Sequence, residues 1–480
     1  MNRFRCCWTL LLLLSFSIVL SASASASASV SEPVQEQEPL ATPPDSPRLT
    51  ALLQAMSRDD AAEAGFWREV TREGAPLVER VPGGPSDTVL VTFLWRQPPG
   101  GGDPGIAIAA WLRNLMPESG GRYDSQLQRL GDSGVWYRSY RMPAQGRFPY
   151  FLVRAQGEQP DPRALFRQHD ASRGLRHEFF QDPLNPRARP YLEHITHGPI
   201  TGGMSYVGGP DAPPDVYALA PPAQRGEVKH YEVPSKVMEE TRRIAVYTPP
   251  GYDPADAARH GVLLVFDGMA YLHTVDLPML LDRLHAQHAI APLLAVMLDS
   301  AGRRGRGQDL PPDSLLSRFL DEELWPWLHQ HYAFSDDPTR AVVAGASLGG
   351  LAAANTAFSL PHRFGNVLSQ SGSYWWWPSP YAGAALTASD DGWTIRRFAD
   401  QPQRPLRFYQ EVGTWENPVM PLTNRRMRDT LRARGYAPCY SEFEGGHDLL
   451  AWGNTFSQGL VALVGQPPMR EETRRRVCQN

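Results

Sequence analysis

The segment Gly345-Ala346-Ser347-Leu348-Gly349 sets a serine between two glycines in the pattern G-x-S-x-G. Residues 341–344 before it are small and apolar, which predicts the end of a buried parallel strand. Residues 348–358 after it predict a helix rich in small side chains. A serine on a tight turn between strand and helix presents its hydroxyl at the edge of a sheet, and the glycines leave room for that turn. This context predicts that Ser347 is the nucleophile of an acyl-transfer reaction.

A serine nucleophile needs a base, and His447 is the predicted base. It lies in Glu444-Gly445-Gly446-His447-Asp448, directly after the last predicted strand, residues 439–443. The glycine pair allows a loop to carry the imidazole back towards the serine. The chain order of serine, then acid, then histidine is the order of an α/β-hydrolase.

The acid that orients the base is predicted to be Glu416. It follows the preceding strand, residues 406–412, in the position where an α/β-hydrolase places its acid. Two other carboxylates stay open, namely Glu411 at the end of that strand and Asp448 beside the base. A Ser-His dyad without an acid is the remaining alternative.

Backbone N–H groups are predicted to stabilise the oxyanion. Leu348 opens the helix after the serine, where its N–H is available to a developing negative charge. The second donor is expected from Gly268 or Met269, in the loop after the strand 262–266. Histidines and cysteines show no convincing metal-binding spacing, so no cofactor is expected.

The elements that position these residues alternate between strand and helix. This alternation predicts a mostly parallel sheet covered on both faces, and therefore an α/β-hydrolase domain over 226–467 with a tail at 468–480. Predicted strands span 228–233, 241–247, 262–266, 294–298, 341–344, 406–412 and 439–443, and predicted helices span 277–287, 315–331, 348–360 and 424–434.

A different sequence pattern precedes the hydrolase domain. Residues 49–72 predict one or two helices, and short β-rich runs separated by turn residues over about 75–160 predict an antiparallel β-sandwich. Residues 161–217 show no clear period and predict an irregular connection. We therefore assign 75–220 to a β-sandwich domain with an irregular connection.

The N-terminus has the pattern of an export signal. Arg3 and Arg5 precede a short apolar run and then a Ser-Ala alternation, which predicts a signal peptide over 1–29. The apolar run is too short for a membrane anchor, so no stable membrane insertion is expected after cleavage. Residues 30–74 then form a leader and a helical segment.

Export would leave two cysteines, Cys439 and Cys478, in an oxidising compartment. A disulfide and two unpaired thiols both stay open, because sequence separation does not give a Cα distance. The 480 residues predict two to three domains. A net charge of −4 without a block of Lys or Arg argues against a nucleic-acid partner, and the oligomeric state is not predictable from the sequence.

Several segments together resemble the enterochelin (enterobactin) esterase family over about residues 85–460. The most specific is Arg363-Phe364-Gly365-Asn366-Val367-Leu368-Ser369-Gln370-Ser371-Gly372-Ser373-Tyr374-Trp375-Trp376. Weaker matches are 91–96, 182–186, 264–268 and 445–448, with Trp452 following.

The resemblance implies a serine esterase that hydrolyses the tri-serine lactone of a ferric catecholate siderophore, after an immunoglobulin-like β-sandwich. Iron would enter only as part of that substrate. The resemblance also implies that Arg306, in an Arg-x-x-Asp-Leu pattern, attracts the trianionic complex; the alternative role for this arginine is an ion pair of the loop. Trp375 and Trp376 would stack on catechol rings or cover the core.

Two departures from the family bear on the prediction. The signal peptide predicts hydrolysis in the periplasm, whereas the typical two-domain member works in the cytoplasm. Residues 301–307 also carry more arginine than expected, at Arg303 and Arg304 as well as Arg306. The competing predictions are an exported carboxylesterase for aryl or acyl esters and a siderophore-binding protein without turnover.

Overall fold

The computed structural model describes residues 45–97, 101–110, 118–119, 122–123, 125–156, 176–191, 200–300, 305–312, 315–378 and 392–478. The predicted signal peptide at 1–29, residues 30–44 of the leader, Arg303 and Arg304 lie outside these residues.

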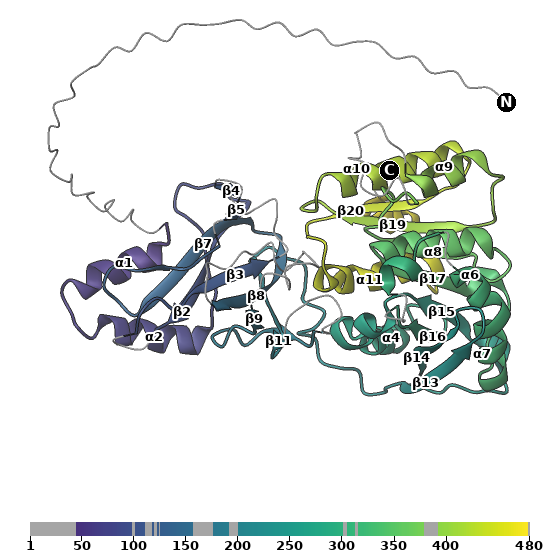
Figure 1. The fold of residues 1–480 in the computed structure, drawn as a ribbon, viewed down its shortest axis with the longest axis horizontal. Helices are drawn as coiled ribbons and strands as arrows, with labels where there is room; N and C mark the ends of the chain where they lie inside the picture. Colours follow the sequence, from purple (N-terminus) through teal and green to yellow (C-terminus); the bar gives the residue numbers. More distant parts are fainter. Residues whose placement is uncertain are drawn as a thin grey trace, which may run out of the picture. The chain divides into compact units, whose positions relative to one another are not determined.

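The hydrolase domain is built on an eight-stranded sheet of order β13-β14-β16-β15-β17-β18-β19-β20 (Figure 1). β14 pairs antiparallel with β13 and β16, and the other strands run parallel to one another. This topology is that of an α/β-hydrolase, as the sequence predicted. The strands are β13 (Glu227–Ser235), β14 (Glu240–Thr248), β15 (Gly261–Val265), β16 (Leu293–Leu298), β17 (Ala341–Ala346), β18 (Asn366–Gln370), β19 (Arg407–Gly413) and β20 (Cys439–Phe443).

Helices cover both faces of this sheet. Along β15, Leu264 packs with α8, α9 and α10 residues, whereas Leu263 and Val265 pack with α4 and α11 residues. A strand that is apolar at every position is therefore buried on both sides. The helices are α3 (Gly268–Ala270), α4 (Leu277–Ala286), α5 (Arg306–Asp309), α6 (Leu316–Phe319), α7 (Trp325–His331), α8 (Leu348–Ser359), α9 (Trp393–Asp400), α10 (Val419–Ala433), α11 (Leu449–Val464) and α12 (Glu471–Val477).

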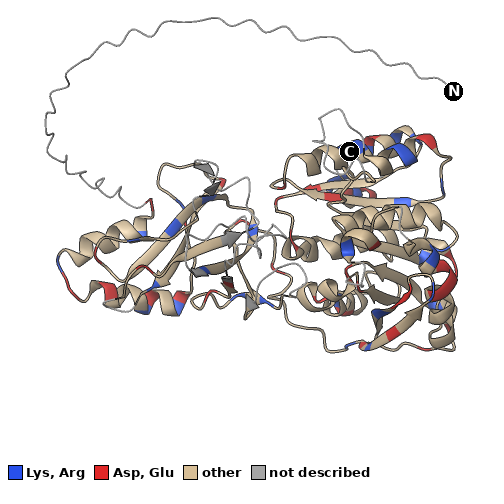
Figure 2. Ribbon diagram, in the orientation of Figure 1, with Lys and Arg blue, Asp and Glu red and all other residues tan. Residues whose placement is uncertain are grey.

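Charged residues of both signs lie along the surface helices of the hydrolase domain, whereas the central strands β15, β16 and β17 carry none (Figure 2). No helix among the described residues is long and apolar enough to cross a membrane. The C-terminal helix α12 is attached to the sheet by a disulfide between Cys439 and Cys478, which resolves the open choice in favour of the bridge.

The N-terminal domain is a sandwich of two sheets with a shared core. One sheet has the order β1-β2-β7-β6, and the other has the order β10-β12-β8-β9-β11 with β3 paired to β8. Side chains from β2, β7, β8 and β12 meet between them. The strands are β1 (Leu77–Glu79), β2 (Thr88–Arg96), β3 (Ile106–Ala110), β6 (Gln128–Arg129), β7 (Val135–Pro143), β8 (Arg147–Gln156), β9 (Arg176–Phe180), β10 (Ala188–Arg189), β11 (Ile200–Thr201) and β12 (Met204–Gly208), with a separate pair β4 (Glu118–Ser119) and β5 (Arg122–Tyr123).

Two helices, α1 (Pro47–Met56) and α2 (Ala62–Glu73), cover the outer face of the first sheet. Leu94 of β2 and Tyr137 of β7 point to this face. Phe93 of β2 and Tyr140 of β7 point into the sandwich. The prediction of one or two helices over 49–72 is confirmed as two.

Three sequence expectations differ from the structure. The irregular connection at 161–217 is wrong where β9 and β12 join β8, because these strands are short and lie among turn residues. β18 was not predicted as a strand, since buried Asn366, Ser369 and Gln370 interrupt its apolar pattern. The 16-residue helix α11, directly after the predicted base, was also missed.

Candidate active site

Ser347 occupies a strained turn between β17 and α8. Its φ of 59° and ψ of −120° fall where L-residues rarely lie, at a cost of roughly 1–3 kcal/mol. The turn also needs Gly345, because a Cβ there would lie 2.6 Å from the carbonyl carbon of Gly349. The Ser347 N–H donates to the Gln370 carbonyl at 2.9 Å, and its carbonyl accepts from the Ser373 N–H at 3.0 Å. The loop after β18 therefore holds the nucleophile turn in place.

Glu416 and His447 meet beyond the ends of the neighbouring strands β19 and β20. The His447 Nδ1 lies 2.6 Å from the Glu416 Oε2, which leaves Nε2 to face a nucleophile. The Glu416 side chain is fully buried. Its other oxygen accepts the Gly413 N–H at 2.8 Å and the Ser371 hydroxyl at 2.5 Å. These donors satisfy the hydrogen-bonding capacity of a buried oxygen.

Ser371 and Trp452 form a second layer behind this pair. The Trp452 Nε1–H donates to the Ser371 Oγ at 2.9 Å, so the Ser371 proton is directed to Glu416. The Trp452 and His447 rings are nearly perpendicular, with their planes at 82° and their centroids 4.8 Å apart. Sequence reasoning assigned no role to Ser371, although the family motif contains it.

The two alternative acids have other partners. Glu411 is buried in β19 and accepts hydrogen bonds from the Gln370 amide at 2.6 Å and the Tyr409 hydroxyl at 2.9 Å. Asp448 caps helix α11 by accepting the Ala451 N–H at 2.8 Å. Burial raises the pKa of both carboxyls to about 7. Of the three carboxylates, Glu416 is the one that the structure brings to His447.

The predicted oxyanion loop follows β15, which is the parallel neighbour of β17. Gly268 and Met269 open the short helix α3, and Leu348 opens α8, so these N–H groups lack acceptors within their own helices. A side chain at Gly268 would have a Cβ 2.2 Å from the carbonyl carbon of Met297. The loop is therefore pressed against β16 and has little freedom to move.

Arg306 joins this loop to the nucleophile turn. Its guanidinium forms two hydrogen bonds of 2.7 Å with the Asp267 carboxylate and a longer one of 3.3 Å with the carbonyl of Ala346. Its side chain is 38% exposed and that of Asp267 is 16% exposed. The structure thus places the predicted anion-binding arginine in an internal ion pair at the site.

The remaining residues of the predicted pattern are occupied elsewhere. Asp309, the acid of Arg-x-x-Asp-Leu, forms a buried ion pair with Arg242. The Trp375 Nε1–H donates to the Met420 sulfur at 3.1 Å, and Trp376 packs on the sheet core. Both tryptophans are half-buried, so each contributes to packing and keeps an exposed part.

The Ser347 hydroxyl has a neighbour that the sequence did not suggest. Its Oγ lies 3.3 Å from the buried Ser373 Oγ, and within the described part of the chain it makes no hydrogen bond to His447. Such contacts are commonly loose in a free enzyme and shorten when substrate binds. Among the described residues there is also no group of three or more His, Cys, Asp or Glu that could hold a metal ion.

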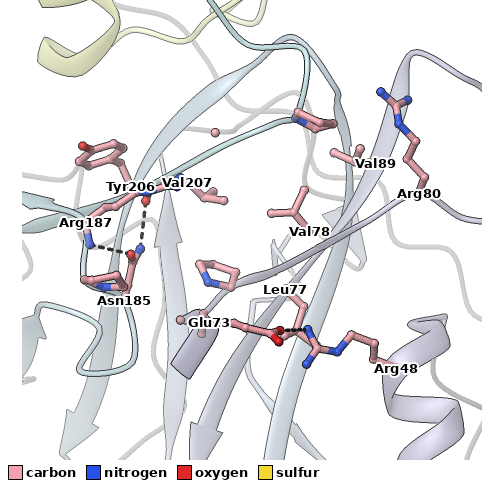
Figure 3. Close-up of a pocket in the computed structure, with 16 residues that line it drawn as sticks. Arg48, Glu73, Leu77, Val78, Arg80, Val89, Asn185, Arg187, Tyr206 and Val207 are labelled. Carbon is pink, nitrogen blue, oxygen red and sulfur yellow. Dashed lines mark hydrogen bonds and ion pairs between the residues drawn. The ribbon is translucent and has the colours of Figure 1, made fainter. Parts of the chain in front are cut away.

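A cavity of about 470 Å³ lies in the N-terminal domain, and none of the predicted site residues lines it (Figure 3). Several of its polar groups are paired with one another. Arg48 and Glu73 form an ion pair of 3.0 Å. The Asn185 side chain donates to the Tyr206 carbonyl and accepts the Arg187 N–H, each at 2.9 Å. This cavity offers no nucleophile with a base, so the candidate site remains at Ser347.

Comparisons with known proteins agree with this division of the chain. Residues 235–463 match the family described as putative esterase, and residues 90–218 match the family described as enterochelin esterase, N-terminal. The iron(III) enterobactin esterase of Dickeya dadantii is 29% identical over 439 residues, covering 86% of this chain and 96% of that protein.

Two further comparisons extend over both domains. The iron(III) salmochelin esterase of Escherichia coli is 24% identical over 407 residues, covering 83% of this chain and 93% of that protein. The crystal structure of the ferric enterobactin esterase of Salmonella typhimurium is 26% identical, with a TM-score of 0.67 and coverage of 83% of this chain and 98% of that one. With a hydrolase domain and the characteristic N-terminal domain both matched, the chain belongs to the enterochelin esterase family.

Proposed function

We propose that this protein is an exported serine esterase that hydrolyses the trilactone ester bonds of a ferric catecholate siderophore. The observation that carries the proposal is the buried Glu416 carboxylate in contact with His447, beyond the same sheet edge as the strained Ser347 turn. The relatives named as iron(III) enterobactin and iron(III) salmochelin esterases support the substrate class. Iron is part of that substrate, and the protein's own residues perform the chemistry.

Acylation begins when the His447 Nε2 accepts the proton of the Ser347 hydroxyl. The Ser347 oxygen attacks the ester carbonyl, and the N–H groups of Leu348 and of Gly268 or Met269 hold the oxyanion that forms. Glu416 stabilises the imidazolium through Nδ1. His447 then gives its proton to the oxygen of the departing serine unit of the substrate as the ester C–O bond breaks.

Deacylation repeats these steps with water as the nucleophile. His447 takes a proton from the water, whose oxygen attacks the acyl-enzyme carbonyl. The collapse of the second intermediate breaks the bond to Ser347 and returns the proton to its oxygen. Each cycle converts one ester of the trilactone into a carboxylic acid and an alcohol.

Hydrolysis in the periplasm is part of the proposal. It is supported by the predicted signal peptide and by the disulfide between Cys439 and Cys478, because such bridges persist in oxidising compartments. Cleavage there would precede transport of the iron across the inner membrane.

The proposal is tested with the purified mature protein on ferric and iron-free enterobactin, with a simple aryl ester alongside and products separated by chromatography. We expect linear serine-catecholate fragments from the wild type. Ser347→Ala should lower kcat by about 10⁶-fold and leave binding nearly intact. Ser359→Ala, at the other end of α8, is the matched control and should retain full activity.

Each alternative gives a different result in the same assay. Cleavage of the aryl ester alone would assign the protein to the general exported carboxylesterases. Siderophore binding without turnover by the wild type would make it a binding protein. An active Ser347→Ala variant would exclude the nucleophile that we propose.

A further inference from the structure

The loops that carry the acid and the base are joined through their backbones. We call residues 413–416 the acid loop and residues 444–448 the base loop. The Trp415 N–H donates to the Gly445 carbonyl at 3.1 Å, and the Thr414 N–H donates to the Phe443 carbonyl at 2.9 Å. Gly413 lies so close to the base loop that a Cβ on it would be 2.4 Å from the Gly445 oxygen. A displacement of one loop must therefore displace the other.

The acid loop is anchored in the other domain by Trp415. Its side chain is 7% exposed and belongs to the core of the N-terminal sandwich, not to that of the hydrolase. The ring stacks on Phe148 of β8, with centroids 4.7 Å apart and planes at 21°. Gly146 makes room for it, since a Cβ there would lie 2.2 Å from the indole Cη2. The ring thus occupies a socket whose shape depends on residues of the N-terminal domain.

The base loop is anchored in the same way at its exit. Leu450, three residues after His447, is buried with N-terminal side chains, among them Phe151 and Met204. One turn further along α11, the Asn454 side chain accepts a hydrogen bond of 3.2 Å from Arg147 of β8. Both catalytic loops therefore end in contacts with a domain whose described residues include none of the predicted catalytic groups.

We infer that the N-terminal domain positions the Glu416–His447 pair, with Trp415 as the principal positioning residue. Trp415 adjoins Glu416 in the chain, and its own N–H binds the base loop, so movement of the ring shifts both members of the pair. Misplacement by about 1 Å can lower a rate by about 10²-fold. The inference rests on the ester hydrolysis in the proposed function and is independent of the siderophore as substrate.

The first test is Trp415→Ala, assayed on a small aryl ester and on ferric enterobactin. We expect kcat to fall by about 10- to 100-fold on both substrates, with KM for the aryl ester within about twofold of the wild type. Trp415→Phe, which keeps a ring against Phe148, should restore most of the rate. If kcat of Trp415→Ala stays within about twofold of the wild type, the inference is wrong.

A second test approaches the same contact from the N-terminal domain. Gly146→Ala places a methyl group against the indole and should lower kcat, although Gly146 lies in another domain from Ser347. If that effect passes through Trp415, Gly146→Ala should cause little further loss in a Trp415→Ala background. Additive losses would show that the two positions act separately and would overturn the inference.

The matched control is Phe93→Leu in the same sandwich core. Phe93 is buried in the same cluster as Trp415, and its ring makes T-shaped contacts with Tyr140 and Tyr150 of the sandwich. Phe93→Leu should lower the melting temperature, as Trp415→Ala is also expected to do because it removes a buried ring, and it should leave kcat within about twofold of the wild type. An equal loss of kcat in Phe93→Leu would mean that general loosening of the domain explains the effect. Aryl-ester turnover keeps these tests valid even if enterobactin is not a substrate.

Discussion

The two flanks of Ser347 are held by different means. On the flank formed by β18, β19 and β20, Trp452, Ser371 and Glu416 form a chain of hydrogen bonds that ends at His447. On the flank formed by β15 and β16, a single ion pair between Arg306 and Asp267 joins the oxyanion loop to the nucleophile turn. The first flank distributes its support over several neutral groups and a neighbouring domain, whereas the second is packed against β16 and joined to the nucleophile turn through one arginine. Substitutions on the two flanks should therefore lower kcat by different amounts.

The largest effect is expected on the first flank, from Glu416→Gln. The amide cannot stabilise the imidazolium and presents a donor to Ser371 or to His447, so the imidazole loses its orientation. We expect kcat to fall by about 10³- to 10⁴-fold, with little change in KM, in steady-state assays on the aryl ester.

Asp448→Asn is the matched control, because asparagine also caps a helix and can keep the contact with the Ala451 N–H. We expect it to retain kcat to within about tenfold. A greater loss in Asp448→Asn than in Glu416→Gln would move the acid to Asp448. A negligible effect of both would favour a Ser-His dyad.

A smaller effect is expected on the second flank, from Arg306→Ala. Without the guanidinium, Asp267 is left without its partner and the oxyanion loop is no longer joined to the Ala346 carbonyl. We expect kcat to fall by about 10²-fold on aryl ester and siderophore alike, which is the typical cost of a lost oxyanion donor. Arg306→Lys should recover only part of the rate, because an ammonium group cannot make the paired contact.

The same variant separates the two roles considered for Arg306. If the arginine instead binds the anionic substrate, Arg306→Ala should raise KM for the ferric siderophore and leave aryl-ester turnover unchanged. That outcome would contradict the positioning role. The comparison of substrates therefore decides whether the second flank is a scaffold or a binding surface.

Sequence patterns were informative where the chemistry depends on local geometry. The elbow at Ser347 needs a particular backbone shape, and His447 follows a glycine pair directly after the last strand, so each could be recognised within one short segment. The mostly parallel sheet followed from apolar strands buried on both faces, although its strand order did not. Glu416 was more difficult to assign, because Glu411 and Asp448 have the same side-chain chemistry and differ only in the partners that folding gives them.

Long-range contacts explain what the sequence did not predict. β18 is interrupted by buried polar residues whose partners come from distant segments, such as Asn366 with the Ala341 carbonyl. The pairing of Arg306 with Asp267 spans 39 residues. Trp415 enters the core of another domain, and nothing in its own segment distinguishes it from a tryptophan of the hydrolase core.

Glu411 lies behind the first flank. Its substitution should have the smallest effect on turnover and should instead change the free energy of unfolding. Burial raises the pKa of Glu411 to about 7 in the folded protein, whereas an unfolded chain gives glutamate a pKa of about 4.3. The folded state therefore keeps a proton that the unfolded state releases, and this contribution to stability is lost as pH rises from about 5 to about 8. Glu411→Gln mimics the protonated form, so urea unfolding should show it gaining stability relative to the wild type over that range.

Asp448 titrates with the same sign, so the variant should reduce the pH dependence and not abolish it. Glu442→Gln is the opposite control. The ion pair with Arg425 lowers the pKa of Glu442, so its contribution is present above the unfolded pKa, and losing it should destabilise the protein at both pH 5 and pH 8. A Glu411→Gln variant whose stability differs from the wild type equally at pH 5 and pH 8 would show that Glu411 is already ionised at pH 5. Hydrogen bonds from Gln370 and Tyr409 would then outweigh burial in setting the pKa of Glu411.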